Sequence, residues 1–162
     1  MADLQFSIGH GFDVHRLVPD RKLILGGIEI PNELGLLGHS DADVLAHALM
    51  DAMLGACAMG DIGHLFPDDD DRFAGADSMK LLEEVVRATS EKGWRLSNCD
   101  VTVICQKPKL AGYINEMRER LADVIGAEPD QISVKATTTE KLGFTGSGEG
   151  IAAEAVCLME RI

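Results

Sequence analysis

The chain has 162 residues, a formal net charge of -12 at pH 7 and only 4% aromatic residues. This length accommodates one domain with a substantial core, residues 1–162, and leaves little room for a second independent core. The negative charge and the scarcity of aromatic side chains argue against nucleic acid and anionic membranes as partners.

Cysteine usage and hydropathy predict a reduced, cytoplasmic protein. The cysteines at 57, 99, 105 and 157 form no C-x-x-C pair, so neither a zinc ribbon nor a dense disulfide framework is expected. Residues 1–6 lack a basic segment followed by an apolar run, and no stretch of about 18 apolar residues occurs. We therefore expect a cytoplasmic protein without a membrane-spanning segment.

The N-terminal part of the sequence predicts a strand, a hairpin and a helix. Residues 5–15 alternate, and their apolar parity predicts the core face of a strand: Phe6, Ile8, Phe12 and Val14. Gly26-Gly27 between two short apolar segments predicts a hairpin of residues 23–25 and 28–30. Ser40 with Asp43 resembles a capping box, which predicts a helix that runs to about Leu54 and ends at Gly55.

The remaining segments alternate between helices and strands. Residues 60–75 are rich in glycine and aspartate and predict a loop, followed by a helix capped by Asp77 or Ser78 that ends at Gly93. Further segments are a strand at 101–105, a helix at 110–125, a strand at 132–136, a glycine-rich loop at 143–150 and a strand at 151–160. This order predicts an α+β fold, a two-layer sandwich of a mixed sheet with helices on one face.

Asp13 and His15 form the first candidate metal site. Two residues apart on a strand, they leave the same face, opposite the apolar parity. One carboxylate and imidazole nitrogens suit zinc, and a catalytic zinc usually has three protein ligands and an open position. A D-x-H pair on a solvated strand face is the plain alternative, and spacing alone does not decide between the two.

His47 is the favoured third ligand among the remaining histidines. It lies in the first predicted helix, with Asp43 and Asp51 four residues away on either side. Either aspartate is positioned by this spacing to orient the imidazole ring. The alternative is a helix histidine that is simply hydrogen-bonded within the core.

Two further segments suit phosphate groups and cations. His39-Ser40 is expected at a helix N-terminus, where free N–H groups favour an anion, although Ser40 also fits a simple cap. Thr137 to Glu140 supply three hydroxyls and a carboxylate suited to phosphate oxygens and a hard cation, although threonines are common in strands. No P-loop, G-x-S-x-G element or nucleophilic cysteine motif occurs, so covalent catalysis is disfavoured.

Four segments together resemble the 2-C-methyl-D-erythritol 2,4-cyclodiphosphate synthase family. They are Gly9-His10-Gly11-Phe12-Asp13-Val14-His15, His39-Ser40-Asp41-Ala42-Asp43-Val44, Gly60-Asp61-Ile62-Gly63 with Phe66-Pro67-Asp68, and Lys135-Ala136-Thr137-Thr138-Thr139-Glu140-Lys141-Leu142-Gly143-Phe144. The resemblance covers nearly the whole chain in order and spacing.

The resemblance implies a homotrimer with active sites between adjacent subunits. It implies zinc on Asp13, His15 and His47, and magnesium or manganese on Glu140. It further implies that the 2-phosphate of 4-diphosphocytidyl-2-C-methyl-D-erythritol 2-phosphate attacks the β-phosphorus, so that CMP leaves and a cyclic diphosphate forms. Zinc would act as a Lewis acid and template, and the second ion would bridge the α and β phosphates.

Catalytic and substrate-binding positions are carried over in the same way. His39 and Thr138 match the family's transition-state stabilisers. Asp61, Gly63, Phe66 and Asp68 match the methylerythritol pocket, and residues 105–111 with Thr137 match the cytidine pocket. The full set of expected substrate contacts is Asp13, His15, His39, Ser40, Asp61, Ile62, Gly63, Phe66, Pro67, Asp68, Asp69, Asp70, Cys105, Gln106, Lys107, Pro108, Lys109, Leu110, Ala111, Thr137, Thr138, Thr139, Glu140, Phe144 and Ser147.

One position departs from the family pattern. Ser147 stands where many members carry arginine, at a position associated with phosphate contacts and an anionic, isoprenoid-like ligand in the central trimer cavity. Serine keeps a donor but loses the charge and the bidentate fork. Two other functions stay open from the residues alone: a metal-dependent phosphohydrolase, and a trimeric binding module with a structural zinc.

Overall fold

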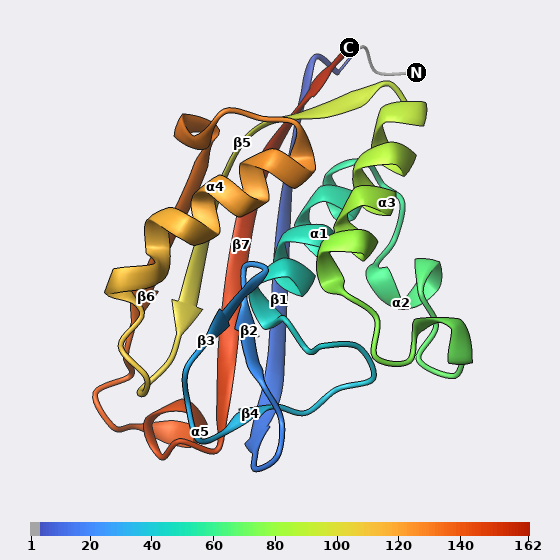
Figure 1. Cartoon of the computed structure of the whole chain (residues 1–162). Coiled ribbons are helices and arrows are strands. Elements are labelled where there is room, and N and C mark those ends of the chain that lie inside the picture. Colours follow the sequence, from blue (N-terminus) through green and yellow to red (C-terminus); the bar gives the residue numbers. More distant parts are fainter. Residues whose placement is uncertain (1–3) are drawn as a thin grey trace.

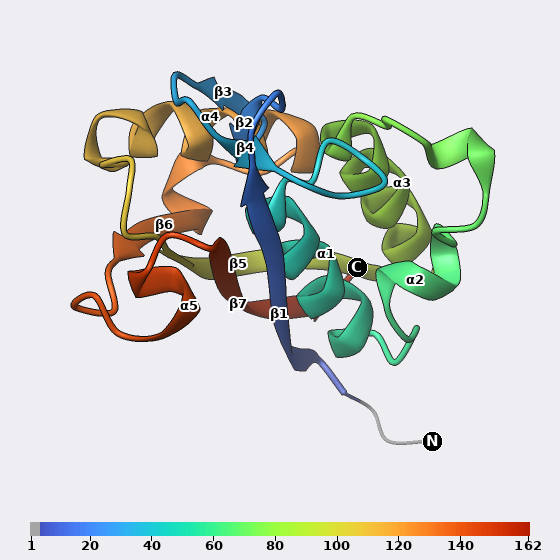
Figure 2. The same cartoon turned by 90° about the horizontal axis from the view of Figure 1, so that it is seen from below.

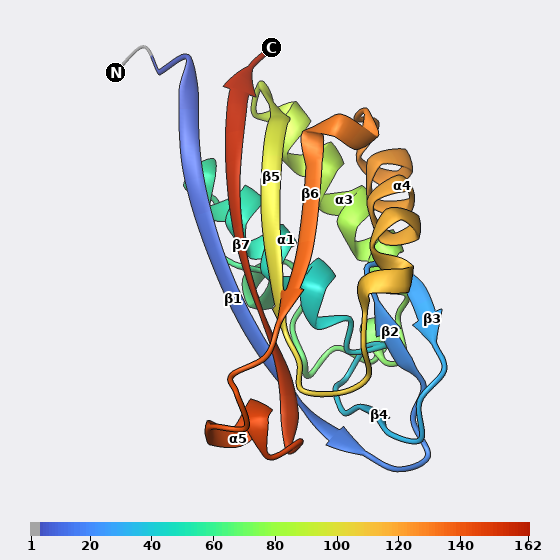
Figure 3. The ribbon, with the colours of Figure 1, turned by 90° about the vertical axis from the view of Figure 1, so that its left-hand side faces the viewer.

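A computed structural model describes residues 4–162 and shows one mixed sheet with helices packed on one face (Figure 1, Figure 3). The five-stranded sheet has the order β4-β1-β7-β5-β6, in which only β5 and β6 pair in parallel. Its strands are β1 Phe6–Val18, β4 Gly35–Leu36, β5 Trp94–Ile104, β6 Ile132–Thr137 and β7 Gly150–Arg161. The predicted α+β architecture is confirmed.

Three helices form the second layer, and a small hairpin covers one end of it (Figure 2). The helices are α1 Val44–Ala56, α3 Ser78–Glu91 and α4 Ile114–Ile125, and the hairpin consists of β2 Leu23–Leu25 and β3 Ile28–Ile30. Helix α1 packs directly on β1 and β7 and is almost wholly buried, which explains its nearly uniform apolar sequence. The predicted hairpin around Gly26-Gly27 and the final strand are confirmed.

The predicted core face of β1 is wrong. Phe6, Ile8, Phe12 and Val14 are 42–73% exposed in the single chain. The opposite parity faces α1, because Gly9 and Gly11 lack side chains and let the helix approach the strand backbone. Asp13 and His15 share this helix-covered side, so the candidate metal ligands lie between the two layers at the end of α1.

The start of α1 also differs from the prediction. Asp43, which is fully buried, is the N-cap and accepts from the Ala46 N–H. It also accepts from the N–H groups of Gly26 and Gly27, which fixes the hairpin against the helix. Ser40 therefore lies outside the helix, His39-Ser40 is not at its N-terminus, and the helix passes through Gly55 to Ala56.

Two predicted loops contain short helices. Residues 60–75 include α2 Ile62–Leu65 and a 3₁₀ turn at Asp71–Phe73, and residues 143–150 include α5 Gly143–Gly146. The third long helix begins at Ile114 after a 3₁₀ turn, four residues later than expected. It ends before Gly126, as predicted, and Gly126 adopts the left-handed conformation. In residues 60–75, capping side chains such as Asp61, which accepts from the His64 N–H, explain why a polar segment folds locally.

The sheet face away from the helices carries exposed apolar side chains. Besides the β1 row, Val156 on β7 is 47% exposed on the same face, opposite His10 in the β1–β7 register. Within residues 4–162, none of the helices has the length and apolar character needed to cross a membrane.

Candidate active site

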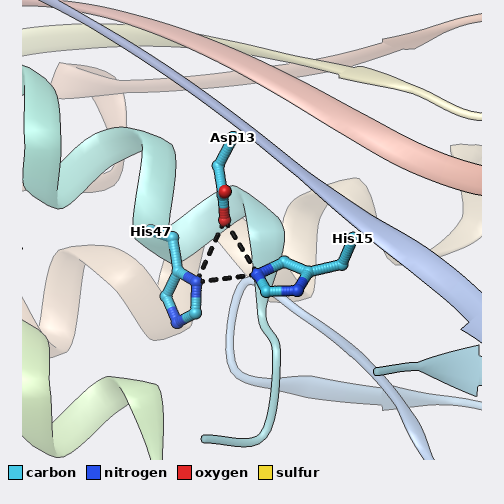
Figure 4. Close-up of side chains that lie close together, drawn as sticks. All are labelled: Asp13, His15 and His47. Atoms are coloured by element: carbon cyan, nitrogen blue, oxygen red, sulfur yellow. Dashed lines mark hydrogen bonds and ion pairs between the residues drawn. The ribbon is translucent and has the colours of Figure 1, made fainter. Parts of the chain in front are cut away.

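Asp13, His15 and His47 converge as predicted (Figure 4). Asp13 Oδ2 lies 3.0 Å from His15 Nε2 and 3.0 Å from His47 Nδ1. The two imidazole nitrogens are 3.2 Å apart. Two ligands come from β1 and the third from α1, so the close packing of strand on helix brings the group together.

The electrostatics of the group favour an ionised aspartate. Burial opposes the charged form of Asp13, but hydrogen bonds from His15 and His47 outweigh it and lower the pKa of Asp13 to about 2. For His15, burial acts to lower the pKa, and the hydrogen bond and charge of Asp13 more than compensate and raise it. The ionised Asp13 carboxylate therefore favours positive charge next to it, whether on an imidazole ring or on a bound cation.

The histidine rings are held by groups other than those predicted. His15 Nδ1 donates to the Leu37 carbonyl at 2.7 Å, which leaves Nε2 free to face Asp13. Asp43 and Asp51 do not orient His47. Asp43 is occupied by backbone N–H groups, and Asp51 accepts from the Ile62 N–H at 2.8 Å and thereby anchors α2.

The donor set fits a tetrahedral metal ion. Two ligands about 2.0 Å from a tetrahedral zinc lie about 3.3 Å apart, and the three separations here are 3.0, 3.0 and 3.2 Å. Among residues 4–162, no fourth histidine, cysteine, aspartate or glutamate joins the group. Three protein ligands leave one position for a substrate oxygen, as in a catalytic site.

A cavity of about 330 Å³ lies in front of the triad. The predicted contacts that line it are Asp13, His15, His39, Ser40, Ile62, Gly63, Phe66 and Asp68. His47 lines it too, and Asp51, Gly38, Phe73 and Leu81, none of them predicted as a substrate contact, complete the wall. Segments far apart in the sequence thus form one pocket beside the triad.

Several aspartates near this cavity have local structural roles. Asp61 caps α2 and accepts from the His64 ring at 2.9 Å, and Asp70 caps the following 3₁₀ turn and forms an ion pair with Arg72 at 2.6 Å. Asp61, Pro67, Asp69 and Asp70 do not line the cavity. His39 Nε2 donates to the Asp70 carbonyl at 3.2 Å. This hydrogen bond holds the loop that contains Asp70 against His39, whose side chain lines the cavity.

A second cavity of about 270 Å³ lies near the end of β6, the edge strand that β7 and β5 separate from β1. The predicted cytidine-pocket residues that line it are Cys105, Gln106, Pro108, Lys109, Leu110, Ala111 and Thr137. Thr138, predicted as a transition-state stabiliser, lines it as well. It shares no lining residue with the first cavity. Within one chain, the predicted nucleotide pocket and metal triad are therefore separate.

The residues after β6 adopt a strained turn. Glu140 is exposed with φ 54°, and the Thr138 hydroxyl accepts from its N–H at 3.2 Å. The Thr139 hydroxyl is used internally, because it donates to the Leu142 carbonyl at 2.6 Å. The hydroxyls of Thr138 and Thr139 thus form local hydrogen bonds, whereas the side chain of Glu140 is exposed to solvent.

Lys107 and Ser147 instead line a third cavity of about 530 Å³. Phe144, in α5, lines none of these three cavities and is 45% exposed. The Ser147 hydroxyl lies 2.7 Å from Glu149 Oε2. Because a carboxylate only accepts, the serine donates its proton there.

Two residues behind the triad, one in contact with His47 and one in contact with the first, were missed from the sequence. Ser78 Oγ lies 3.0 Å from His47 Nε2, and Asp41 accepts from Ser78. Ser78 was interpreted only as a possible helix cap, and Asp41 only as part of a motif. Nothing in the local sequence places the start of α3 beside α1, so this contact depends on the tertiary fold.

Residues 6–160 match the sequence profile of the YgbB family. The chain belongs to the YgbB family. Relatives in this family include the 2-C-methyl-D-erythritol 2,4-cyclodiphosphate synthase of Trichlorobacter lovleyi, which is 64% identical over 152 residues, or 94% of this chain and 97% of the relative. The enzyme of the same name from Lachnospira eligens is 59% identical over 155 residues, or 96% of this chain and 85% of the relative.

Solved structures of the family share the fold. A structure of IspF from Plasmodium falciparum in complex with CDP superposes with a TM-score of 0.86 at 32% identity and covers 99% of both chains. The bifunctional IspDF from Campylobacter jejuni gives a TM-score of 0.94 at 44% identity over 97% of this chain. This chain spans 42% of that bifunctional protein.

Proposed function

We propose that the chain converts 4-diphosphocytidyl-2-C-methyl-D-erythritol 2-phosphate to 2-C-methyl-D-erythritol 2,4-cyclodiphosphate and CMP, as a phosphorus-oxygen lyase of non-mevalonate isoprenoid biosynthesis. The observation that carries the proposal is the convergence of Asp13, His15 and His47 on one cavity. It is supported by relatives up to 64% identical that bear the name of this synthase, and by a related structure that binds CDP.

The proposed metal ligands follow from the donor types. Asp13, His15 and His47 would hold zinc, and the exposed carboxylate of Glu140 would hold magnesium or manganese. When bound, the ions would supply Lewis-acid polarisation and neutralise charge on the diphosphate. Asp13 contributes a carboxylate that stays ionised over the physiological range, since its pKa is lowered to about 2.

The remaining residues bind and orient the substrate. His39 and Thr138 are the proposed hydrogen-bond donors to phosphate oxygens, one from each cavity. The 2-phosphate oxygen forms a bond to the β-phosphorus while the bond to the CMP oxygen breaks, so no water is consumed. Phe66, only 9% exposed, and the cavity wall around it would keep water from the reacting phosphorus.

The proposed assembly is a homotrimer whose active sites lie between subunits. Two observations support it: the apolar row of β1 is exposed in the single chain, and the two cavities that the substrate needs share no lining residue. Exposed apolar rows of this kind mark association surfaces. A neighbour's second cavity would then complete the first. Residues 1–162 are proposed as a single domain in the cytoplasm.

Phosphorus NMR of the metal-loaded protein with substrate tests the reaction. The proposal predicts CMP and a cyclic diphosphate in equal amounts, with no oxygen from labelled water in the product. Free phosphate as the main product, with labelled oxygen incorporated, would instead indicate a phosphohydrolase and would contradict the proposal. If neither substrate nor CMP binds, the chain is no enzyme of this class.

A further inference from the structure

The ring of His47 is fixed from the side that faces away from Asp13. Nδ1 points to Asp13 Oδ2 (Figure 4), while Nε2 lies 3.0 Å from Ser78 Oγ and 3.2 Å from Ser40 Oγ. His47 is 7% exposed and Ser78 is fully buried. The protons of these hydroxyls therefore influence which ring nitrogen is protonated.

Asp41 determines where the Ser78 proton goes. Ser78 Oγ donates to Asp41 Oδ1 at 2.5 Å, and the Ser78 backbone N–H donates to Asp41 Oδ2 at 3.0 Å. A carboxylate only accepts hydrogen bonds, so the single hydroxyl proton is used on Asp41. The Ser78 oxygen is left to accept, and its partner is His47 Nε2–H.

We propose that Ser78 and Asp41 are positioning residues that hold the His47 proton on Nε2 and so present the Nδ1 lone pair to the metal. This rests on the proposed metal role of His47, not on the identity of the substrate. The arrangement parallels His15, whose Nδ1 donates to the Leu37 carbonyl and leaves Nε2 for the ion. The Leu37 carbonyl and the Ser78 hydroxyl thus hold His15 and His47 in opposite tautomers, so that His15 faces the ion through Nε2 and His47 through Nδ1.

The variant Asp41→Asn tests how the Ser78 proton is held. Asp41 Oδ2 accepts from the Ser78 N–H, and Oδ1 accepts from the Asp43 N–H at 3.1 Å as well as from the Ser78 hydroxyl. In either orientation the amide NH₂ of Asn faces one of these backbone donors. When it takes the Oδ1 position it also faces Ser78 Oγ, and the Ser78 proton is turned towards His47 Nε2. Nε2–H and the hydroxyl proton now compete, which disfavours the tautomer needed for ligation through Nδ1.

Two measurements test the positioning role of Ser78 and Asp41. The first is zinc affinity, measured by competition with a chelator, and the second is histidine nitrogen NMR of the zinc-loaded protein. We expect Asp41→Asn and Ser78→Ala each to weaken zinc binding about 10- to 100-fold, the range found for partners of metal-bound histidines. In the wild type, the His47 Nε2–H should exchange slowly with water and Nδ1 should be the coordinating atom. In Ser78→Ala the exchange should become fast.

Asp77→Ala is the matched control. Asp77 caps α3 by accepting from the Met79 N–H at 2.9 Å and has no bond to His47 among the described contacts. The variant Asp77→Ala should lower the stability of α3 but leave zinc affinity and the His47 Nε2–H signal unchanged. If Asp41→Asn does not fold, Ser78→Ala alone carries the test, since it removes one hydroxyl without changing charge.

The outcomes separate this proposal from the proposed reaction. Zinc affinities within twofold of the wild type in both variants, or coordination through Nε2, would overturn it even in an active synthase. Weakened zinc binding in both variants, in a chain that forms no cyclic diphosphate, would support it while contradicting the proposed reaction.

Discussion

Gly11 lies directly under Ala48, and a Cβ built on Gly11 would be 1.9 Å from the Ala48 carbonyl oxygen. The added Cβ would meet a backbone oxygen, so rotating a side chain cannot relieve the clash. This close approach of β1 to α1 places Asp13 and His15 within reach of His47.

Gly11→Ala is therefore expected to destabilise the fold strongly, by more than the roughly 1–3 kcal/mol typical of overpacking. Urea unfolding measures the effect as a free energy. Gly55→Ala is the control, because no atom lies within 4 Å of its added Cβ and it sits inside α1. It should stabilise the protein by about 0.5–1 kcal/mol. Equal effects of the two changes would contradict this account of the packing.

Gly38→Ala should weaken both the metal site and the fold. Its Cβ would lie 2.9 Å from His15 Cε1 and 2.9 Å from Ala42 Cβ, so the imidazole must shift. We expect zinc affinity to fall about 10-fold or more, with a loss of stability of about 1–3 kcal/mol. Gly112→Ala, with no atom within 4 Å, should change neither quantity. Unchanged zinc affinity in Gly38→Ala would show that the ring position is not critical.

The stability of the metal-free protein should depend on pH through His15. Its pKa is raised from 6.5 by Asp13, against the effect of burial, so the folded state binds the proton more tightly than the unfolded chain. The stabilisation is complete below the unfolded pKa and is lost as the pH rises through the folded pKa. The difference in unfolding free energy between wild type and His15→Gln should therefore shrink as the pH rises from about 6 through the raised pKa of the folded state. A constant difference would contradict the assignment.

The exposed row of β1 should control assembly. Ile8 is 73% exposed in the single chain, and Ile8→Glu would place a charge in the proposed subunit contact. Light scattering should show a mass of three chains for the wild type and one chain for this variant. Leu65→Glu, on α2 and 39% exposed, is the control and should remain trimeric. A wild-type monomer would refute the shared active site.

The sequence predicted the elements better than it predicted their faces. Helix ends marked by Asp77 and Gly126, and the turn at Gly26-Gly27, were found because local backbone chemistry sets them. The face of β1 was mispredicted because alternation shows two different sides but not which one a helix covers. In this strand the glycine side is buried and the apolar side is exposed.

The candidate site shows the same division. The pair Asp13 and His15 follows from strand spacing, but the choice of His47 needed the family resemblance as well. Ser78, Asp41 and Gly38 could not be found, since their roles depend on how α3 and the loop before α1 pack around the triad.

Anomalous diffraction at the zinc edge, from crystals of the zinc-loaded wild type and of His47→Ala, tests the central claim most directly. The account predicts one peak in the wild type, bonded to Asp13 Oδ2, His15 Nε2 and His47 Nδ1 with a non-protein fourth ligand, and no peak in the variant, which should keep its fold. A full-occupancy peak at the same place in His47→Ala, or a fourth protein ligand in the wild type, would contradict it.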